Sequence, residues 1–272
     1  MVHGLWSVDK HKAQHTKMIA FIILIAIVIF AVYFFTTRNK SKVKAVSEML
    51  LDPVLLENNV LFYSKLDETG RKQFEEDVLY FLKHVTVSGV DTEVDELDKL
   101  LVASAAVIPI FYFKKWKYHN LREVLLYTDA INMQFETTGN SERNILGMVG
   151  TGPFEGSMML SKPALRQGFS NQSDKHNTAI HEFVHLIDIS DGETDGIPEL
   201  LLDKQYVIPW LNLIHEQMQQ IAEGKSDIDS YAYSNKSEFL AVTAEYFFEN
   251  PELLEEKHPE LYNILKEMFD TP

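Results

Sequence analysis

The chain has 272 residues, 46% hydrophobic and 24% charged, which is enough apolar content for a globular domain and excludes bulk disorder. Its formal net charge of −15 argues against a nucleic-acid-binding surface, because contact with phosphates requires an excess of lysine and arginine. The absence of cysteine excludes disulfides, cysteine-ligated zinc and thiol nucleophiles, but it leaves the compartment open.

The N-terminal part contains an unbroken apolar run at residues 18–35 that carries no charge. Its length is at the short end for a membrane-spanning helix. It ends without the small-residue cleavage site of a signal peptide, and it shows no polar face of the kind expected for a helix in a soluble core. We therefore predict a transmembrane anchor at 18–35, preceded by a tail at 1–17 and followed by a basic linker at 36–46.

The charges that flank this run bear on its orientation. Residues 1–44 carry a formal charge of +6, and the basic residues after the run have no acidic residue among them. The positive-inside rule then favours a cytoplasmic position for the part that follows. We expect a single-pass membrane protein, with the part that follows the run in the cytoplasm.

Residues 47–272 are predicted to form one α+β domain, with helices segregated from a small mixed or antiparallel sheet. Apolar residues recur at three- and four-residue steps from about Ser47, and a second helical pattern runs from Glu93 to Pro109. The chain is again helical after about residue 173, apart from a polar loop at 190–198. Short β-branched and aromatic runs between these parts predict strands at residues 110–113 and 124–127, and two further short strands are expected at 148–149 and 156–160, on either side of a turn rich in glycine and proline.

The strongest chemical signal is the run His181-Glu182-Phe183-Val184-His185. On a helix the two histidines lie on one face, one turn apart, where two imidazoles can bind one Zn²⁺. Glu182 is then placed to activate a water molecule at the metal. The same pattern would arise by chance in about 3% of chains of this composition, by multiplying residue frequencies for the motif. The spacing therefore indicates a zinc-dependent hydrolase.

Catalytic zinc usually has three protein ligands, and the third is expected on a later helix. Glu238 and Glu245 are both candidates, because they are seven residues apart and share a helix face. Glu238 also lies three residues after Asn235, which is the spacing of a capping box. Glu245 could equally be an ordinary exposed or salt-bridged residue. Spacing alone does not decide which of Glu238 and Glu245 is the third ligand.

The chain from about Leu79 to its C-terminus resembles the Mlc titration factor A (MtfA) family of zinc peptidases. The same blocks are similar to the catalytic domain of anthrax lethal factor. The similar blocks are residues 101–106, 122–127, the histidine motif continued through Asp188, 238–248 and 251–254.

This resemblance implies a zincin-like metallopeptidase fold in which Glu238 is the third zinc ligand. It also implies that Tyr231 lies over the metal, with Tyr233 as the rival if the loop is shifted. In the expected mechanism Glu182 takes a proton from water and later delivers it to the leaving amine. Zinc and the phenol of Tyr231 would together stabilise the oxyanion.

Two further carboxylates are candidates for orienting a ligand histidine. Asp188 lies nearly one turn after His185, although it could equally be an ordinary residue at a helix C-terminus. Glu245 lies near the helix face of Glu238 and could play a similar part.

The resemblance implies aminopeptidase-like cleavage of a peptide or protein substrate. The alternative is a regulatory protein that binds a transcription repressor or another partner, with a structural or idle zinc site, since the family is named for sequestering the Mlc repressor. Glu182 favours the enzyme, because a structural site needs only its ligands. A hydrolase of non-peptide amides is a third option.

Overall fold

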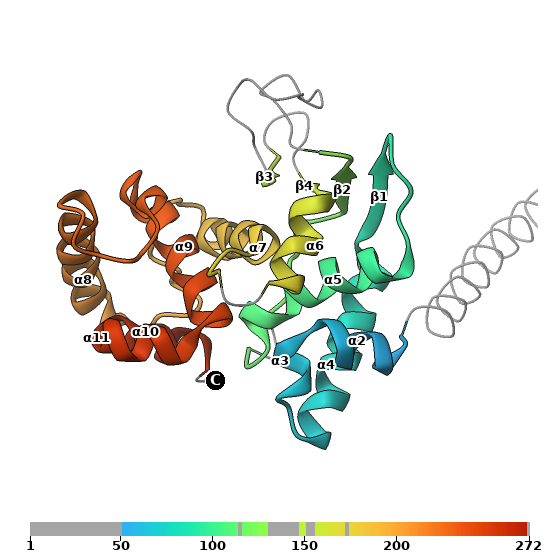
Figure 1. The fold of residues 1–272 in the computed structure, drawn as a ribbon, viewed down its shortest axis with the longest axis horizontal. Coiled ribbons are helices and arrows are strands. Elements are labelled where there is room, and N and C mark those ends of the chain that lie inside the picture. Colours follow the sequence, from blue (N-terminus) through green and yellow to red (C-terminus); the bar gives the residue numbers. More distant parts are fainter. Residues whose placement is uncertain (1–50, 114–115, 130–146, 151–155, 172–173, 271–272) are drawn as a thin grey trace, which may run out of the picture. The chain divides into compact units, whose positions relative to one another are not determined.

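The structure, a computed structural model, describes residues 51–113, 116–129, 147–150, 156–171 and 174–270, within the unit Leu50–Pro272 (Figure 1). The anchor predicted at 18–35 lies outside these ranges. Inside them, no helix combines the length and the apolar character needed to cross a bilayer.

The N-terminal helices begin at side-chain caps. Asp52 accepts a hydrogen bond at the start of α2, Asp67 does so at the start of α4, and Asp95 forms a complete capping box with Asp98 at the start of α5. From Leu100 to Val107, α5 is buried on every side. It is therefore the central helix of this half, in contact with α4, α6 and α7. These elements are α2 (Pro53–Asn59), α3 (Leu61–Ser64), α4 (Glu68–His84), α5 (Glu96–Val107) and η1 (Ile108–Ile110).

A four-stranded mixed sheet lies beside these helices in the order β1-β2-β4-β3. The pairs β1–β2 and β2–β4 are parallel, while β3 runs antiparallel to β4 and forms one edge. Val124 pairs with Met158, and both face the main core, whereas Met159 packs on the opposite face with Tyr127. The strands are β1 (Thr86–Val90), β2 (Glu123–Tyr127), β3 (Gly147–Val149) and β4 (Ser157–Ser161).

The C-terminal half is helical, and α9 packs closely on α7 (Figure 1). Both helices are buried over most of their surface, which fixes their mutual register through apolar contacts. The elements are α6 (Lys162–Ser170), α7 (Thr178–Asp188), η3 (Ile189–Asp191), α8 (Lys204–Ala222), η4 (Ser230–Tyr233), α9 (Lys236–Glu249), α10 (Pro251–Lys257) and α11 (Pro259–Phe269).

The prediction of an α+β domain with a small sheet agrees with this arrangement, and the strands expected at 124–127, 148–149 and 156–160 are present. The strand expected at 110–113 is wrong. This segment continues the buried end of α5 through a 3₁₀ turn, with Ile110 and Phe111 in the core. A short apolar run has no periodicity that separates a strand from a buried turn.

Candidate metal centre

Helix α7 carries the histidine motif and starts at Asn177, whose side chain accepts a hydrogen bond from the backbone N–H of Ile180. Two other residues of N-cap type, Ser173 and Asp174, precede Asn177 in the sequence. Asp174 instead accepts from the N–H of His176, before the helix, and residue 173 lies outside the described ranges. The apolar face of α7 packs into the core, so its remaining face presents the motif's polar side chains to a cleft.

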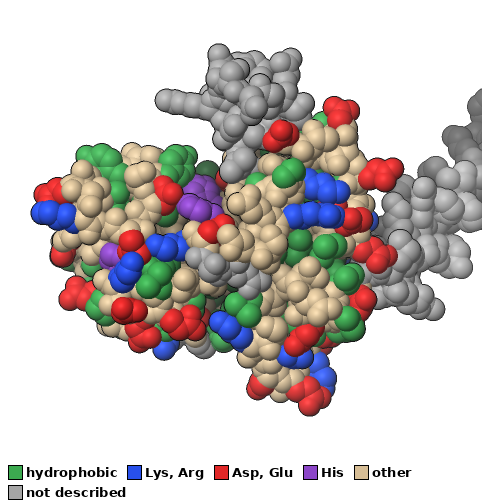
Figure 2. Space-filling view, in the orientation of Figure 1, with side chains coloured by type: hydrophobic (Ala, Val, Ile, Leu, Met, Phe, Trp, Pro, Cys, Tyr) green, Lys and Arg blue, Asp and Glu red, His purple; other side chains and the backbone are tan. Residues whose placement is uncertain are grey.

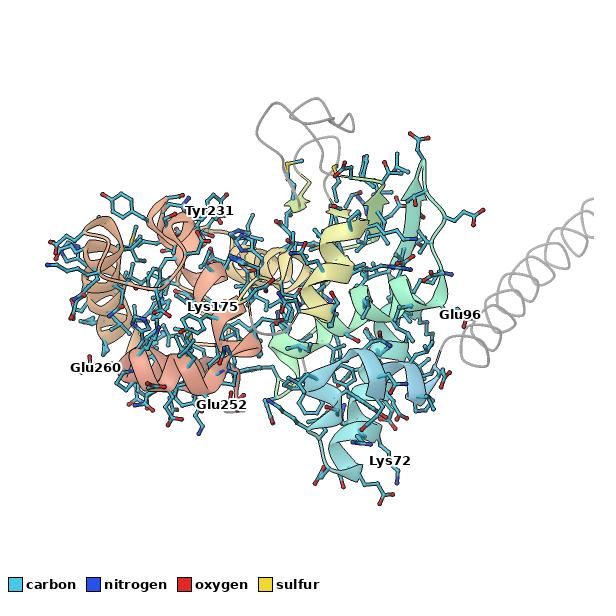
Figure 3. All side chains as sticks on the ribbon, in the orientation of Figure 1. Lys72, Glu96, Lys175, Tyr231, Glu252 and Glu260 are labelled. Carbon is cyan, nitrogen blue, oxygen red and sulfur yellow. The ribbon has the colours of Figure 1, made fainter. Side chains whose placement is uncertain are left out.

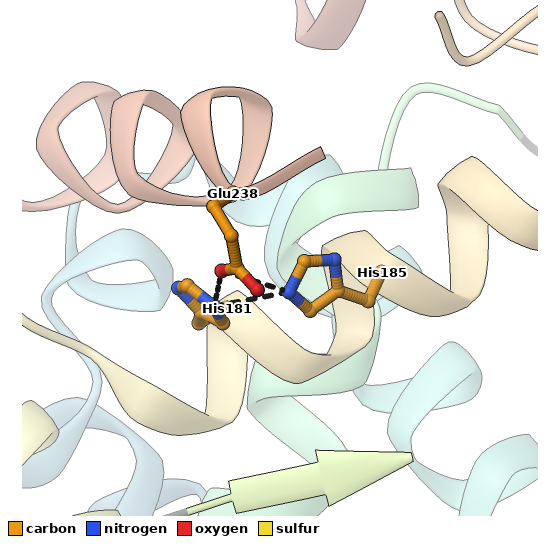
Figure 4. A group of neighbouring side chains, drawn as sticks. All are labelled: His181, His185 and Glu238. Atoms are coloured by element: carbon orange, nitrogen blue, oxygen red, sulfur yellow. Dashed lines mark hydrogen bonds and ion pairs between the residues drawn. The ribbon is translucent and has the colours of Figure 1, made fainter. Parts of the chain in front are cut away.

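Three ligand atoms converge between α7 and α9 (Figure 4). Nε2 of His181 lies 3.0 Å from Oε2 of Glu238, and Nε2 of His185 lies 3.3 Å from the same oxygen. The two Nε2 atoms are 3.1 Å apart. The first turn of α9 thus brings a carboxylate against two imidazoles that are one helical turn apart on α7.

This geometry fits a zinc ion. Ligand atoms 2.0–2.1 Å from a tetrahedral zinc lie roughly 3.3 Å from one another. Nε2 of His181, Nε2 of His185 and Oε2 of Glu238 lie close to that separation, and all three atoms can coordinate a cation. Two nitrogens and one carboxylate oxygen leave a fourth position open, which is typical of catalytic and not of structural zinc.

Each histidine is held at its other ring nitrogen. Nδ1 of His181 lies 2.7 Å from Oε1 of Glu245, and Nδ1 of His185 lies 3.0 Å from Oγ of Ser237. The Ser237 hydroxyl donates in turn to Asp188 at 2.6 Å. Because carboxylate and hydroxyl oxygens accept from Nδ1–H, Nδ1 keeps its hydrogen in both rings and Nε2 is the nitrogen left to bind a metal ion.

The charges at the centre are strongly coupled. Burial alone would lower the pKa of His181, but hydrogen bonds to the carboxylates of Glu238 and Glu245 outweigh it and raise that pKa to about 10. Burial would raise the pKa of Glu238, yet its hydrogen bonds to both histidines lower it well below the usual range. The site therefore concentrates negative charge around the imidazoles, an environment that attracts a cation.

Glu182 lies next to the ligands and borders a cleft of about 960 Å³. Burial raises the pKa of its carboxyl, although the two neighbouring histidines oppose that shift. Strand β3 approaches it closely: a Cβ on Gly147 would come within 2.6 Å of Cγ of Glu182. The edge strand thus forms one wall beside this carboxylate.

Tyr231 borders the same cleft from η4, and its ring centroid is 6.1 Å from that of His181 (Figure 3). Its side chain is 54% exposed, so the phenol can reach a bound molecule. Tyr233 is equally exposed but does not line the cleft. Figure 2 shows histidine side chains at the surface between the C-terminal helices and the sheet.

The structure brings together His181, His185 and Glu238, the set that the family resemblance implies, with Glu182 and Tyr231 beside them. Asn235 does cap α9 by accepting from the N–H of Glu238, but the Glu238 carboxylate points to the histidines. Asn235 therefore acts as a simple N-cap, and the Glu238 carboxylate faces the histidines instead of completing a capping box.

The two candidate orienting carboxylates differ in their contacts. Glu245 contacts a ligand histidine directly, whereas Asp188 does so only through Ser237. Sequence reasoning missed Ser237, whose one signal is its position next to Glu238. It also missed Asn177, an N-cap type of residue immediately before the motif's helix.

Comparison with known proteins gives consistent matches. The family model described as glucose-regulated metallo-peptidase M90 matches residues 35–270. An uncharacterized protein of Synechocystis is 26% identical over 226 residues, covering 79% of this chain and 82% of its own length. Proteins named Mlc titration factor A are also similar. That of Pectobacterium atrosepticum is 29% identical over 54% of this chain and 58% of its own, and that of Edwardsiella ictaluri is 28% identical over 63% and 69%.

Proposed function

Because the chain belongs to the glucose-regulated metallo-peptidase M90 family, we propose that it is a zinc-dependent peptidase whose metal is held by His181, His185 and Glu238. The resemblance to the MtfA family noted in the sequence is confirmed by the matched relatives. The observation that carries the proposal is the convergence of three ligand atoms beside Glu182 at an open cleft. That combination supplies both a metal site and a base within reach of a substrate.

A zinc ion bound there would act as a Lewis acid, polarising the scissile carbonyl and making a water molecule more acidic. Glu182 accepts the proton of the attacking water and delivers it to the leaving amine. Its raised pKa suits both steps, because a general base works best when its pKa approaches the operating pH. Tyr231, whose ring lies beside that of His181, donates its phenolic hydrogen to the developing oxyanion.

We further propose aminopeptidase-like action on peptides, which the family resemblance supports. The cleft, at about 960 Å³, has room for several residues of a substrate. The edge strand of the sheet on the cleft side is β3. Strand β4 lies between β2 and β3 and so has no free edge to pair with a substrate. A regulatory binding role is the second candidate, supported by the name Mlc titration factor A that several relatives carry.

The test compares the full-length wild type with Glu182→Gln and Glu238→Ala. We expect one zinc per chain and peptide cleavage in the wild type. Glu182→Gln should retain zinc but lose about 10²–10⁴-fold in kcat, because only the proton transfer is removed. Glu238→Ala should lose zinc affinity. Metal analysis and cleavage of aminoacyl and peptide substrates measure these outcomes.

Glu260→Gln is a matched control, because Glu260 is exposed on α11 away from the centre. It should behave like the wild type in both assays. A wild type that holds zinc but cleaves no peptide would favour the regulatory role. A wild type that binds no metal would contradict the proposal.

A further inference from the structure

Asn177 is buried where helices α6, α7 and α9 meet, with only 1% of its surface exposed. Its Oδ1 accepts from the N–H of Ile180 at 3.1 Å, which caps α7. Its Nδ2 donates to the carbonyl of Gly168 on α6 at 3.1 Å and to Oε1 of Glu249 on α9 at 3.0 Å. The side chain therefore uses both its acceptor and its donors, and it ties the start of α7 to both neighbouring helices.

The backbone of the same residue contacts the metal centre through Glu245. The N–H of Asn177 donates to Oε2 of Glu245 at 2.6 Å, while Oε1 of that carboxylate lies 2.7 Å from Nδ1 of His181. The two oxygens of Glu245 are thus occupied by different partners. Since a carboxylate held at both oxygens cannot rotate freely, the position of Asn177 determines how Glu245 meets the imidazole.

The junction has little room to adjust. A Cβ on Gly168 would lie 2.8 Å from Cγ of Asn177 and 3.1 Å from its Cα. The absence of a side chain at this point of α6 allows the helix to contact Asn177 directly. Behind it, Glu249 is itself 8% exposed, and its Oε2 has no hydrogen-bond partner within the described chain.

We propose that Asn177 is a positioning residue for the metal centre: it holds the Glu245 carboxylate on Nδ1 of His181 and thereby fixes the direction of the His181 Nε2 lone pair. This inference rests on the proposed zinc site and adds a residue that the ligand motif does not contain. A capping residue alone would stabilise α7. A positioning residue must also affect zinc affinity separately from stability.

The experiment compares Asn177→Ala and Asn177→Ser in the full-length chain. Serine is also a good N-cap, so Asn177→Ser should recover most of the thermal stability that alanine loses. Its side chain is too short to reach α6 and α9, so its zinc dissociation constant should remain 10–100-fold weaker than that of the wild type. If serine restores both stability and zinc affinity, Asn177 acts only as a cap and the proposal is overturned.

Two further variants separate the effects. Asn250→Ala removes the cap of α10, which accepts from Leu253, and should lower the melting temperature by a few degrees without changing zinc affinity. Gly168→Ala replaces a helical glycine by a better helix former, yet it should weaken zinc binding by displacing Asn177. Equal zinc affinities in Gly168→Ala and the wild type would count against the proposal.

A spectroscopic readout does not depend on zinc. In metal-free protein, the proton between Nδ1 of His181 and Glu245 should give a downfield NMR resonance that is absent in His181→Gln. That resonance should be broadened or lost in Asn177→Ser, and its persistence there would overturn the inference. Failure of the wild type to bind zinc would instead contradict the proposed function. The NMR measurement would still decide whether Asn177 holds Glu245 on His181.

Discussion

The two ligand histidines are held by unequal partners, and this difference decides how each contributes to the centre. His181 is oriented by the carboxylate of Glu245, whereas His185 is oriented by the neutral hydroxyl of Ser237. A charged acceptor forms a stronger hydrogen bond with Nδ1–H and makes the imidazole a better electron donor. His181 should therefore bind zinc more strongly than His185.

This inequality gives a prediction for the two partners. Glu245→Gln should weaken zinc affinity about 10–100-fold, because an amide removes the charge and can turn its NH₂ toward the ring. Ser237→Ala should have a smaller effect, since it removes a neutral acceptor. Competition with a chromogenic chelator measures both constants. A larger loss in Ser237→Ala than in Glu245→Gln would contradict the assignment.

The buried carboxyl of Glu249 should make the free energy of unfolding depend on pH. Burial raises its pKa to about 8 in the folded chain, so between its unfolded value and pH 8 the folded state holds a proton that the unfolded state has released. The stability that this group contributes is fully present at low pH and is lost as pH rises through 8. Glu249→Gln should therefore become more stable than the wild type as pH rises, by up to an amount on the order of 5 kcal/mol.

Denaturant titrations at pH 5, 7 and 9 measure this difference. The exposed Glu260, replaced by glutamine, is the control and should follow the wild-type curve. If Glu249→Gln and the wild type change in parallel over this range, the carboxyl of Glu249 does not retain its proton in the folded chain.

At this scale the sequence indicated the residues that belong to a motif and the two carboxylates Asp188 and Glu245 as candidate supports, but not Ser237 or Asn177. His181, Glu182 and His185 are recognisable by spacing, and Glu238 by the block it opens. Ser237 could not be recognised, because its contact with His185 depends on the docking of α9 against α7. A hydrogen bond between residues about fifty positions apart leaves no periodic pattern in a sequence.

Helix α9 organises the centre because it contributes two carboxylates, two turns apart, to the same imidazole. Glu238 meets Nε2 of His181 and Glu245 meets Nδ1. The seven-residue separation of Glu238 and Glu245 made both plausible ligands in the sequence, and the same separation places both on one face of α9. Both early candidates for the third ligand thus contact His181, from opposite sides of its ring.

Strand β3 constrains Glu182 through Gly147, which lies against that side chain. Replacing Gly147 by alanine would bring a methyl group within 2.6 Å of Cγ and 2.8 Å of Oε1 of Glu182. We expect at least a tenfold loss of kcat, because a shifted base transfers protons poorly, whereas the zinc ligands are untouched. Peptide cleavage and zinc content, measured on the same sample, test this. A fully active Gly147→Ala would show that β3 does not constrain Glu182.

The strands illustrate which elements can be predicted. Val124 to Tyr127 is β-branched and aromatic and proved to be a strand, as expected. The segment 86–90 contains Ser88 and Gly89, which suggest a turn, yet it forms the parallel edge strand β1 through pairing with β2. Pairing with a distant strand overrode the local preference, and such pairing is not visible in a single sequence.

At the scale of the whole molecule, charge and hydrophobicity are concentrated in different segments. The apolar run at 18–35 stands apart from the acidic remainder, and we propose that it anchors the chain in a membrane with residues 47–272 on the cytoplasmic side. Deleting residues 18–35 should move the protein from the membrane pellet to the supernatant. Alkaline carbonate extraction should release only the deleted form. Release of the full-length chain by carbonate would contradict the anchor.

The metal ligands come from two helices that are separated along the chain by η3, α8 and η4. Figure 1 shows α8 on the outer side of α9, away from the sheet. The inner face of α8 is buried in the core and η4 carries Tyr231 at the cleft. Because the cost of closing a loop grows only slowly with its length, the exposed part of this intervening segment can lengthen or change with little penalty to the ligand geometry. It is thus a place where evolution can diversify the molecule's outer surface while the metal centre stays the same.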